Sequence, residues 1–207
     1  MKILIACEFS GIVRDAFLAK GHDVMSCDLL PSERPGPHYQ GDVMDIIDDG
    51  WDLMIAHPPC TYLTTAGNRS FVNNPERCIK RSESIEFVKM LYNSNIPKVA
   101  IENPQGYLNT MWKKPSQCVH PYMFGDNVMK RTCFWLKGLP KLYHTVNSVF
   151  HHSEIPPDPL YIRTKGKTKG KKVHFCEMAS GKDGKPRWQV RATTFNGIAK
   201  AMAEQWG

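Results

Sequence analysis

The sequence places a thiol and a carboxyl group directly after two apolar segments. Cys60 follows Pro58-Pro59 at the end of the run Leu53–Ala56, and Glu102 follows the run Lys98–Ile101. Both runs are typical of buried strands, and two prolines cannot extend the hydrogen-bonded ladder of a strand. A thiol and a carboxyl group at neighbouring strand ends suit nucleophilic attack assisted by an acid. For Cys60 alone, the alternative is a small buried side chain beside a structural turn.

The rest of the chain alternates segments of strand and helix type. This alternation predicts a doubly wound α/β sheet with helices on both faces, whose parallel strands bring their carboxyl ends to one edge. Ser10 would cap the first helix, Gly21 would end it, and residues 61–75 would form a polar loop. Strands are expected at Lys2–Ala6, Asp23–Cys27, a short segment ending at Gly41-Asp42-Val43, Trp51–His57, Lys98–Ile101 and Arg131–Lys137. Helices are expected at Gly11–Lys20, Ile79–Leu91 and Phe195–Trp206.

Two further strand ends carry residues that suit a nucleotide-like ligand. After the first strand, the turn Glu8–Gly11 leads into a helix, and Gly11 would let the backbone approach a ligand at the helix N-terminus. A simple tight turn is the alternative. After the second strand comes Asp28, where nucleotide-binding sheets keep an acid for the ribose hydroxyls. An ordinary surface carboxylate is the alternative there.

The positive charge of the chain is concentrated in one late segment. The net charge is +7, and residues 161–191 hold ten of the 27 Lys and Arg residues but two of the 20 Asp and Glu residues. Such clustering is typical of a protein that binds a polyanion. The alternative is a solvated basic loop without a partner. Tyr161 and Trp188 in this segment would stack on bases or anchor the loop to the domain.

Cysteine content and hydropathy favour a reducing cytoplasm. The seven cysteines form no C-x-x-C pair, which argues against a disulfide framework. The N-terminal apolar run lacks a cleavage site, and no run approaches the length of a bilayer span, so we expect neither a signal peptide nor a membrane partner. Cys118, His120, His174 and Cys176 have zinc-binding side chains, but their spacing fits no common zinc module, so no metal is expected.

Taken in chain order, these motifs resemble those of the DNA cytosine-5 methyltransferase family. That family carries a Phe-x-Gly turn, an acid, a Gly-Asp-Ile/Val, a Pro-Cys and a Glu-Asn-Val. On these motifs the chain is similar to a short, divergent member of the kind found in phages and prophages. The matching residues are Phe9-Ser10-Gly11, Asp28, Gly41-Asp42-Val43, Pro58-Pro59-Cys60, Glu102-Asn103-Pro104, Lys130-Arg131-Thr132 for the later basic motif and Phe195-Asn196-Gly197 for the closing motif.

The resemblance implies a Rossmann-like sheet, a methyl donor and a covalent mechanism. S-adenosylmethionine would give its methyl group to C5 of a cytosine in DNA. Cys60 would add to C6 of the flipped base, Glu102 would protonate or hydrogen-bond N3, and Asn103 would help to hold the turn. Arg131 would contact the base carbonyl. The residues implied for the cofactor are Phe9, Ser10 and Gly11 along its length, Asp28 at the ribose, Asp42 and Val43 at adenine, and Pro58 and Asn196 in the same pocket.

The resemblance also divides the chain into three parts. Residues 1–143 would form the catalytic and cofactor-binding α/β core, residues 144–190 a small basic insertion that serves as a reduced target-recognition segment, and residues 191–207 a helix that returns to the core. The family's Gln after Pro-Cys is Thr61 in this chain, and its Glu-Asn-Val ends in Pro104. A small basic insertion favours phosphate contacts over extensive base reading.

Three hypotheses for function follow. The leading one is methyl transfer to cytosine C5 in DNA, and the alternatives are the same fold acting on RNA or a free pyrimidine nucleotide, and a non-catalytic nucleic-acid-binding relative. The residue before the two prolines, His57, is expected to make a structural hydrogen bond, with a contact to the substrate as the alternative. The target sequence and the oligomeric state are not encoded in these patterns.

Overall fold

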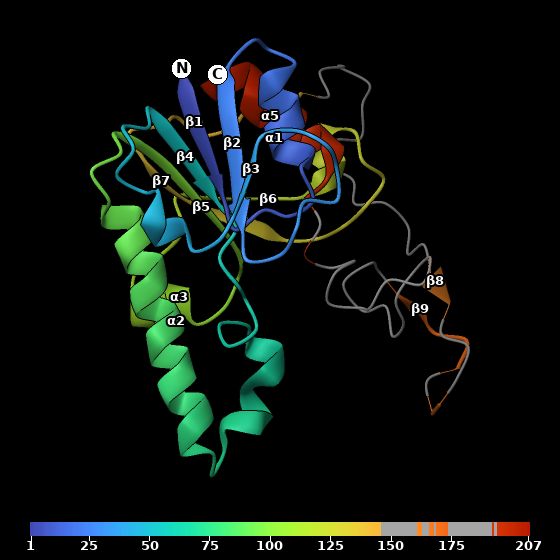
Figure 1. Ribbon diagram of the computed structural model, residues 1–207. Helices are drawn as coiled ribbons and strands as arrows, with labels where there is room; N and C mark the ends of the chain where they lie inside the picture. The colour runs from blue at the N-terminus through green and yellow to red at the C-terminus, as the bar shows by residue number, and fades with distance from the viewer. Residues whose placement is uncertain (146–160, 163–165, 168, 174–191, 193) are drawn as a thin grey trace.

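A seven-stranded sheet with helices on both faces forms the centre of the molecule (Figure 1). The computed structural model describes residues 1–145, 161–162, 166–167, 169–173, 192 and 194–207. The strands of the main sheet, in chain order, are β1 (Lys2–Ala6), β2 (Asp23–Asp28), β3 (His38–Gln40), β4 (Leu53–Ala56), β5 (Lys98–Pro104), β6 (Gln117–Val119) and β7 (Thr132–Lys137).

The strands follow the order β3-β2-β1-β4-β5-β7-β6, and β1 to β5 are parallel. Strand β7 runs antiparallel to both β5 and β6. The strand order reverses between β1 and β4: the chain continues from β1 towards β2 on one side and from β4 towards β5 on the other. In such sheets a crevice lies between the two connections, at the carboxyl ends of these strands. This mostly parallel, doubly wound sheet confirms the predicted α/β class.

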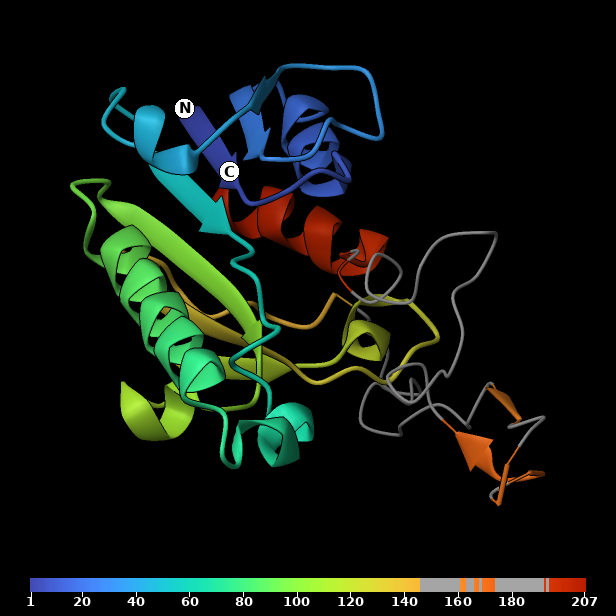
Figure 2. The same ribbon diagram turned by 60° about the horizontal axis from the view of Figure 1, so that its bottom comes forward.

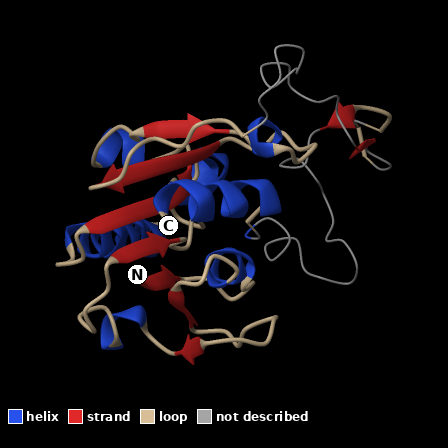
Figure 3. Ribbon diagram, turned by 90° about the horizontal axis from the view of Figure 1, so that it is seen from above, coloured by secondary structure: helices blue, strands red, loops and turns tan. Residues whose placement is uncertain are grey.

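Helices cover the two faces because successive strand residues point to opposite sides. Ile3 and Ile5 pack in one core cluster with α1 (Ile12–Leu18) and α5 (Asn196–Trp206). Leu4 belongs to the other cluster, together with the buried face of α2 (Pro75–Asn93). Figure 3 views the sheet from above, with the helices on either side of it. The shorter helical elements are α3 (Leu108–Met111), η1 (Val43–Asp45), η2 (Thr65–Phe71) and η3 (Pro121–Phe124).

Several boundaries differ from those expected from the sequence. Strand β5 continues to Pro104 because its last residues pair with β7, with Asn103 opposite Cys133. The expected loop 61–75 contains η2 and ends at the first residue of α2. Asn74 caps α2 by accepting a hydrogen bond from the Arg77 backbone N–H at 3.1 Å, and Pro75 fits the first helical position, where no N–H is needed.

A separate antiparallel hairpin comes from the basic part of the chain. It consists of β8 (Tyr161–Ile162) and β9 (Lys172–Val173), and it lies apart from the main sheet in Figures 1 and 2. Most of the expected insertion 144–190, including Trp188, lies outside the described residues. Within the part of the chain that the structure describes, no helix is long and apolar enough to cross a bilayer.

Candidate functional site

Two cavities open at the carboxyl edge of the parallel strands, next to the point where the strand order reverses. The larger cavity, of about 270 Å³, has Cys7, Asp28, Asp42, Val43, Pro59 and Phe87 in its wall. The smaller cavity, of about 10 Å³, has His57, Glu102, Lys130, Thr132, Thr194 and Phe195 in its wall. The segment from His57 to Pro59 therefore reaches both cavities.

The larger cavity has a carboxylate on each of two neighbouring loops. Asp28 ends β2 and accepts a hydrogen bond of 2.9 Å from the Leu30 backbone N–H. Burial raises the pKa of Asp28, although the backbone N–H groups of Leu30 and Leu29 act in the opposite direction. Asp42 follows β3 and caps η1 by accepting from the Met44 N–H at 3.0 Å. Both carboxylates keep acceptor capacity for ligand hydroxyl groups.

The thiol of Cys7 also lines the larger cavity. Cys7 has a φ of 57°, so the chain turns left-handed directly after β1, which is uncommon for a residue other than glycine. Burial and the negative charge of Asp28 raise the pKa of the Cys7 thiol. The same causes raise the pKa of Cys27 to about 12. Both thiols are therefore neutral at physiological pH, and neither is a nucleophile in this environment.

The turn between β1 and α1 is closed by Glu8 rather than by Ser10. The Glu8 carboxylate accepts hydrogen bonds from the backbone N–H groups of Val13 and Arg14, at 2.7 and 3.2 Å. The Ser10 hydroxyl donates to Glu8 at 3.0 Å and accepts from the Ile12 N–H at 3.3 Å. The expected Ser10 cap is thus only one part of a larger cap, because a buried carboxylate outcompetes a hydroxyl for the first N–H groups.

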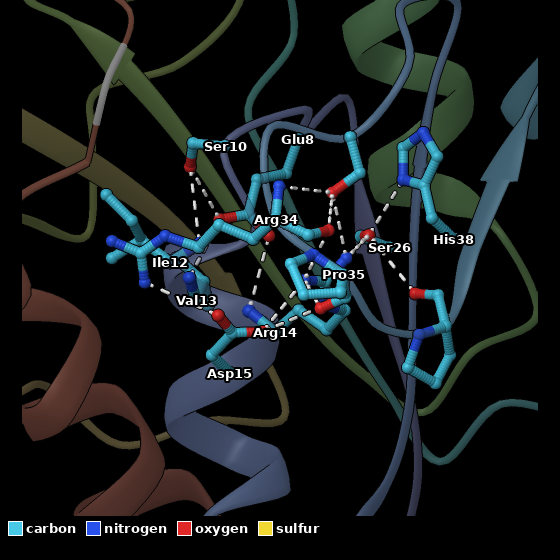
Figure 4. A network of polar contacts seen from close by, with 12 residues as sticks. Glu8, Ser10, Ile12, Val13, Arg14, Asp15, Ser26, Arg34, Pro35 and His38 are labelled. Carbon is cyan, nitrogen blue, oxygen red and sulfur yellow. Dashed lines mark hydrogen bonds and ion pairs between the residues drawn. The ribbon is translucent and has the colours of Figure 1, made fainter.

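Arg14 explains why Gly11 is a glycine. The buried guanidinium of Arg14 donates to Ser26 at 3.2 Å and to the Pro35 carbonyl at 2.9 Å, within the polar network of Figure 4. A Cβ on Gly11 would lie 2.6 Å from Nη2 of Arg14, and Gly11 has a φ of 71°. The turn therefore requires glycine for packing and backbone conformation, without any ligand.

The loop that carries Cys60 is held from two sides. The His57 backbone N–H donates to the Ala6 carbonyl at 2.9 Å, which joins the end of β4 to β1. The buried side chain of Asn103 donates to the Pro58 carbonyl at 2.9 Å, which joins the same turn to β5. Cys60 is exposed, and its carbonyl accepts from the backbone N–H groups of Leu63 and Thr64.

The segment after Cys60 is anchored to α2 by Arg81. Its Nε donates to the Tyr62 carbonyl at 2.8 Å. Its guanidinium carbon lies 3.3 Å from the ring centroid of Phe71 and 3.6 Å from that of Tyr107, distances typical of cation–π contacts. Arg81 is buried, so its positive charge supports the loop rather than a phosphate contact.

In the smaller cavity an imidazole and a carboxylate form a pair. His57 Nδ1 lies 3.3 Å from Oε2 of Glu102. Burial alone would raise the pKa of Glu102, but the hydrogen bond from His57 and the charge of Lys130 together hold that pKa below its usual range. Glu102 is therefore ionised at neutral pH. This differs from the role of a proton donor to N3 that the resemblance implies for Glu102, because a donor needs a protonated carboxyl group.

The residues proposed from the sequence are distributed unevenly around the two cavities. Asp28, Asp42 and Val43 lie in the wall of the larger cavity, and Glu102 lies in the wall of the smaller one. Asn103 supports the turn. The remaining residues line neither cavity: Phe9 and Ser10 are buried in the β1–α1 turn with Gly11, Pro58 is buried, and Cys60, Arg131 and Asn196 are exposed.

Direct neighbours of some proposed residues line the cavities in their place. Pro59 lines the larger cavity next to Pro58, while Lys130 and Phe195 line the smaller cavity next to Arg131 and Asn196. Sequence reasoning missed Cys7, Phe87 and Lys130. Only Lys130 had a signal in the sequence, as the other cation of the basic motif.

No protein-family model matches the chain, and no curated protein matches it either. Metal binding has no support in the described residues, which contain no group of three or more His, Cys, Asp or Glu side chains that could hold an ion. Of the four residues with zinc-binding side chains, Cys118 belongs to β6 and His120 follows it. His174 and Cys176 lie outside the described residues.

The larger cavity combines apolar side chains with carboxylate acceptors. Its volume is near the lower end of the range of roughly 300–1,000 Å³ for ligand pockets. Val43, Leu29 and Phe87 give it apolar surface for a base, and two carboxylates give it acceptors for a ribose diol. Among the described residues no Lys or Arg lines this wall, and Glu8 occupies N–H groups of α1, so a phosphate there would meet the carboxylates of Asp28 and Asp42 rather than donors.

Proposed function

We propose that the protein is an S-adenosylmethionine-dependent methyltransferase that acts on C5 of a cytosine in DNA through Cys60. The observation that carries this proposal is that the segment His57 to Pro59, directly before Cys60, borders a cavity of about 270 Å³ with Pro59 and a cavity containing the Glu102 carboxylate with His57. A methyl transfer needs a donor and an acceptor brought together across a short distance. This segment is where the two would meet.

The chemistry of the larger cavity supports S-adenosylmethionine over a phosphorylated cofactor. Asp28 would accept from the ribose hydroxyls, and Asp42 and Val43 would border the base. When bound, S-adenosylmethionine supplies an electrophilic methyl group. The negative charge of the cavity suits a cationic ligand without phosphates, and it disfavours nucleotides such as NAD.

Cys60, together with Glu102 in the wall of the smaller cavity, would then act on the acceptor base. The thiolate of Cys60 would add to C6 of the pyrimidine and increase the electron density at C5 and N3. Glu102 would transfer a proton to N3 or hydrogen-bond it. Asn103 fixes the Pro58 carbonyl and so sets the direction in which the turn presents Cys60. After transfer, loss of the C5 proton and elimination of the thiolate release the product.

A pyrimidine ring does not fit the smaller cavity in this conformation, since about 10 Å³ holds at most about one water molecule. Thr194 and Phe195, which precede α5, form part of its wall together with Lys130. The ring of Phe195 lies 5.6 Å from Nζ of Lys130. Entry of a flipped base therefore requires Thr194, Phe195 and Lys130 to move apart. The unstacked base would then occupy the widened cavity.

A basic segment favours a polymeric substrate over a free nucleotide. In the described part of it, Lys167, Lys169, Lys171 and Lys172 are exposed around the β8–β9 hairpin. Such a cluster would contact phosphates rather than read bases. The same charge suits RNA, and parallel assays on DNA and RNA separate the two substrates.

The test is transfer of labelled methyl groups from S-adenosylmethionine to duplex DNA, single-stranded DNA, RNA and deoxycytidine nucleotide in parallel. Wild type is compared with Cys60→Ala and with the control Cys78→Ala, which removes another exposed thiol on α2. The proposal predicts 5-methylcytosine in DNA for wild type and control, and none for Cys60→Ala. Transfer that survives in Cys60→Ala would contradict the covalent mechanism, and label in RNA or nucleotide alone would contradict the DNA assignment.

A further inference from the structure

The ring of His57 is oriented by one partner and leaves its second nitrogen unused. The side chain is 8% exposed, and Nδ1 lies 3.3 Å from Oε2 of Glu102. Nε2 is buried and has no hydrogen-bond partner within the described residues. Buried polar atoms are nearly always satisfied, so an orphaned nitrogen in a cavity wall points to a group that arrives with the substrate.

The partner of His57 lacks the proton that the proposed chemistry requires. Glu102 accepts the hydrogen bond of His57, and the charges of Lys130 and His57 favour its ionised form. A carboxylate cannot donate to N3 of a pyrimidine. The proton must reach Glu102 from a neighbour, and the imidazole of His57 is in direct contact with it.

We propose that His57 is a positioning residue that supplies the proton which Glu102 passes to N3 of the substrate ring. The inference rests on the proposed function and adds a residue that the motif resemblance does not assign. The imidazolium form would donate from Nδ1 to Glu102 and keep the proton on Nε2, where the arriving substrate or a water molecule accepts a hydrogen bond.

The proton balance of this relay closes over one turnover. As the Cys60 sulfur bonds to C6, Nδ1 of His57 gives its proton to the Glu102 carboxylate and Glu102 passes that proton to N3, which leaves His57 neutral and Glu102 ionised. When the thiolate leaves C6, N3 returns its proton to Glu102 and Glu102 returns it to Nδ1. The proton from C5 goes to solvent, and no oxidant or reductant is needed.

Charged groups from three elements face this relay. Glu102 comes from β5 and Lys130 from the segment before β7. Asp28, at the end of β2, interacts electrostatically with His57. The relay requires a protonated imidazole at His57, so the transfer rate should fall as pH rises.

The test is the pH profile of single-turnover methyl transfer in wild type and His57→Gln, with His22→Gln as a control histidine at the opposite end of the sheet. Glutamine can donate to Glu102 but does not titrate near neutral pH. We expect His57→Gln to lower the rate roughly 100-fold or more, to lose the fall at high pH and to keep its affinity for S-adenosylmethionine and DNA. A wild-type pH profile in this variant overturns the relay.

A second measurement does not depend on the variant folding. In wild type with ¹⁵N-labelled histidine, NMR would show both His57 nitrogens protonated in the complex with cofactor and DNA, and a neutral ring in that complex overturns the relay. If the wild type transfers no methyl group to cytosine, both the proposed function and the relay are overturned. An active wild type with an unperturbed His57→Gln overturns the relay alone, so the two failures are distinguishable.

Discussion

The side-chain amide of Asn103 donates a 2.9 Å hydrogen bond to the Pro58 carbonyl, and this bond ties the end of β5 to the turn that carries Cys60. Proline gives the turn its stiffness, because two consecutive rings fix φ. Asn103 then fixes the position of this turn relative to Glu102, which directly precedes Asn103 in β5. This contact therefore helps to fix the Cys60 thiol relative to the Glu102 carboxylate.

Loss of this contact should reduce catalysis more than binding. In Asn103→Ala, the Pro58 carbonyl loses its donor, which we expect to lower the free energy of unfolding by about 1–3 kcal/mol. The transfer rate should fall at least about tenfold with little change in cofactor affinity, because a small misplacement of the nucleophile is costly. Calorimetry and single-turnover kinetics measure the two effects. Asn95→Ala, at an exposed asparagine, is the control and should change neither.

Arg14 should contribute more to stability than the neighbouring exposed arginine. Its guanidinium is fully buried and hydrogen-bonds two serines, Asp15 and two backbone carbonyls. Arg14→Met would leave several of these acceptors unpaired, and we expect a loss of roughly 3 kcal/mol in urea unfolding. Arg34→Gln removes an exposed ion pair of 3.3 Å to Asp15 and should cost less than about 1 kcal/mol. Equal losses in the two variants would contradict this assignment.

Asp28 is expected to lower the free energy of unfolding at neutral pH while it strengthens the binding of the cofactor. Burial raises its pKa in the folded protein, so the folded state holds the proton more tightly than the unfolded state. The wild type therefore loses stability as pH rises through the raised pKa, and Asp28→Asn should be the more stable protein at neutral pH. The difference should vanish below about pH 3.9, where the carboxyl group is protonated in both states.

The same substitution should weaken cofactor binding at neutral pH by at least about tenfold, because a charged acceptor for the ribose hydroxyls is lost. Thermal unfolding between pH 3 and 8 and titration calorimetry measure both effects. Asp23→Asn, at an exposed position at the other end of β2, is the matched control. An Asp28→Asn variant that binds S-adenosylmethionine as tightly as wild type would count against the assigned cavity.

Lys130 and Arg131 are neighbours with different expected effects. Lys130 lines the smaller cavity and lowers the pKa of Glu102, whereas Arg131 is exposed. Glu102 stabilises the fold above its unfolded pKa, and this contribution is lost as pH falls through its lowered folded pKa. Lys130→Met should raise the Glu102 pKa and move this loss to higher pH, which ¹³C NMR of the carboxyl group would detect. Arg131→Met should leave the Glu102 pKa unchanged. A larger shift of the Glu102 pKa in Arg131→Met than in Lys130→Met would contradict the role assigned to Lys130.

Apolar runs made most strands of the main sheet predictable, because such runs report burial directly. Asp28 and Glu102 come directly after such runs, and each lies in a cavity wall. Residues whose roles depend on partners distant in the chain were not predictable in this way. Arg14 reaches a carbonyl 21 residues away, and no local pattern indicates that contact.

Strand β6 and helix η2 were also hard to predict. Strand β6 has three residues and depends on pairing with β7, so its own composition gives little signal. Helix η2 consists largely of polar and small residues, which are typical of loops, and Arg81 from α2 donates a hydrogen bond to Asn68 within it. In both cases tertiary contacts outweigh local propensity.

The central claim is that Cys60 forms a covalent bond to a cytosine. The most direct measurement is mass spectrometry of the protein incubated with S-adenosylmethionine and a DNA duplex that contains 5-fluorocytosine, since fluorine at C5 cannot leave as a proton does and the adduct accumulates. The account predicts a stable adduct that maps to the peptide containing Cys60 and that is lost in Cys60→Ala. An adduct on another cysteine, or no adduct from a protein that still transfers methyl groups to normal cytosine, would contradict it.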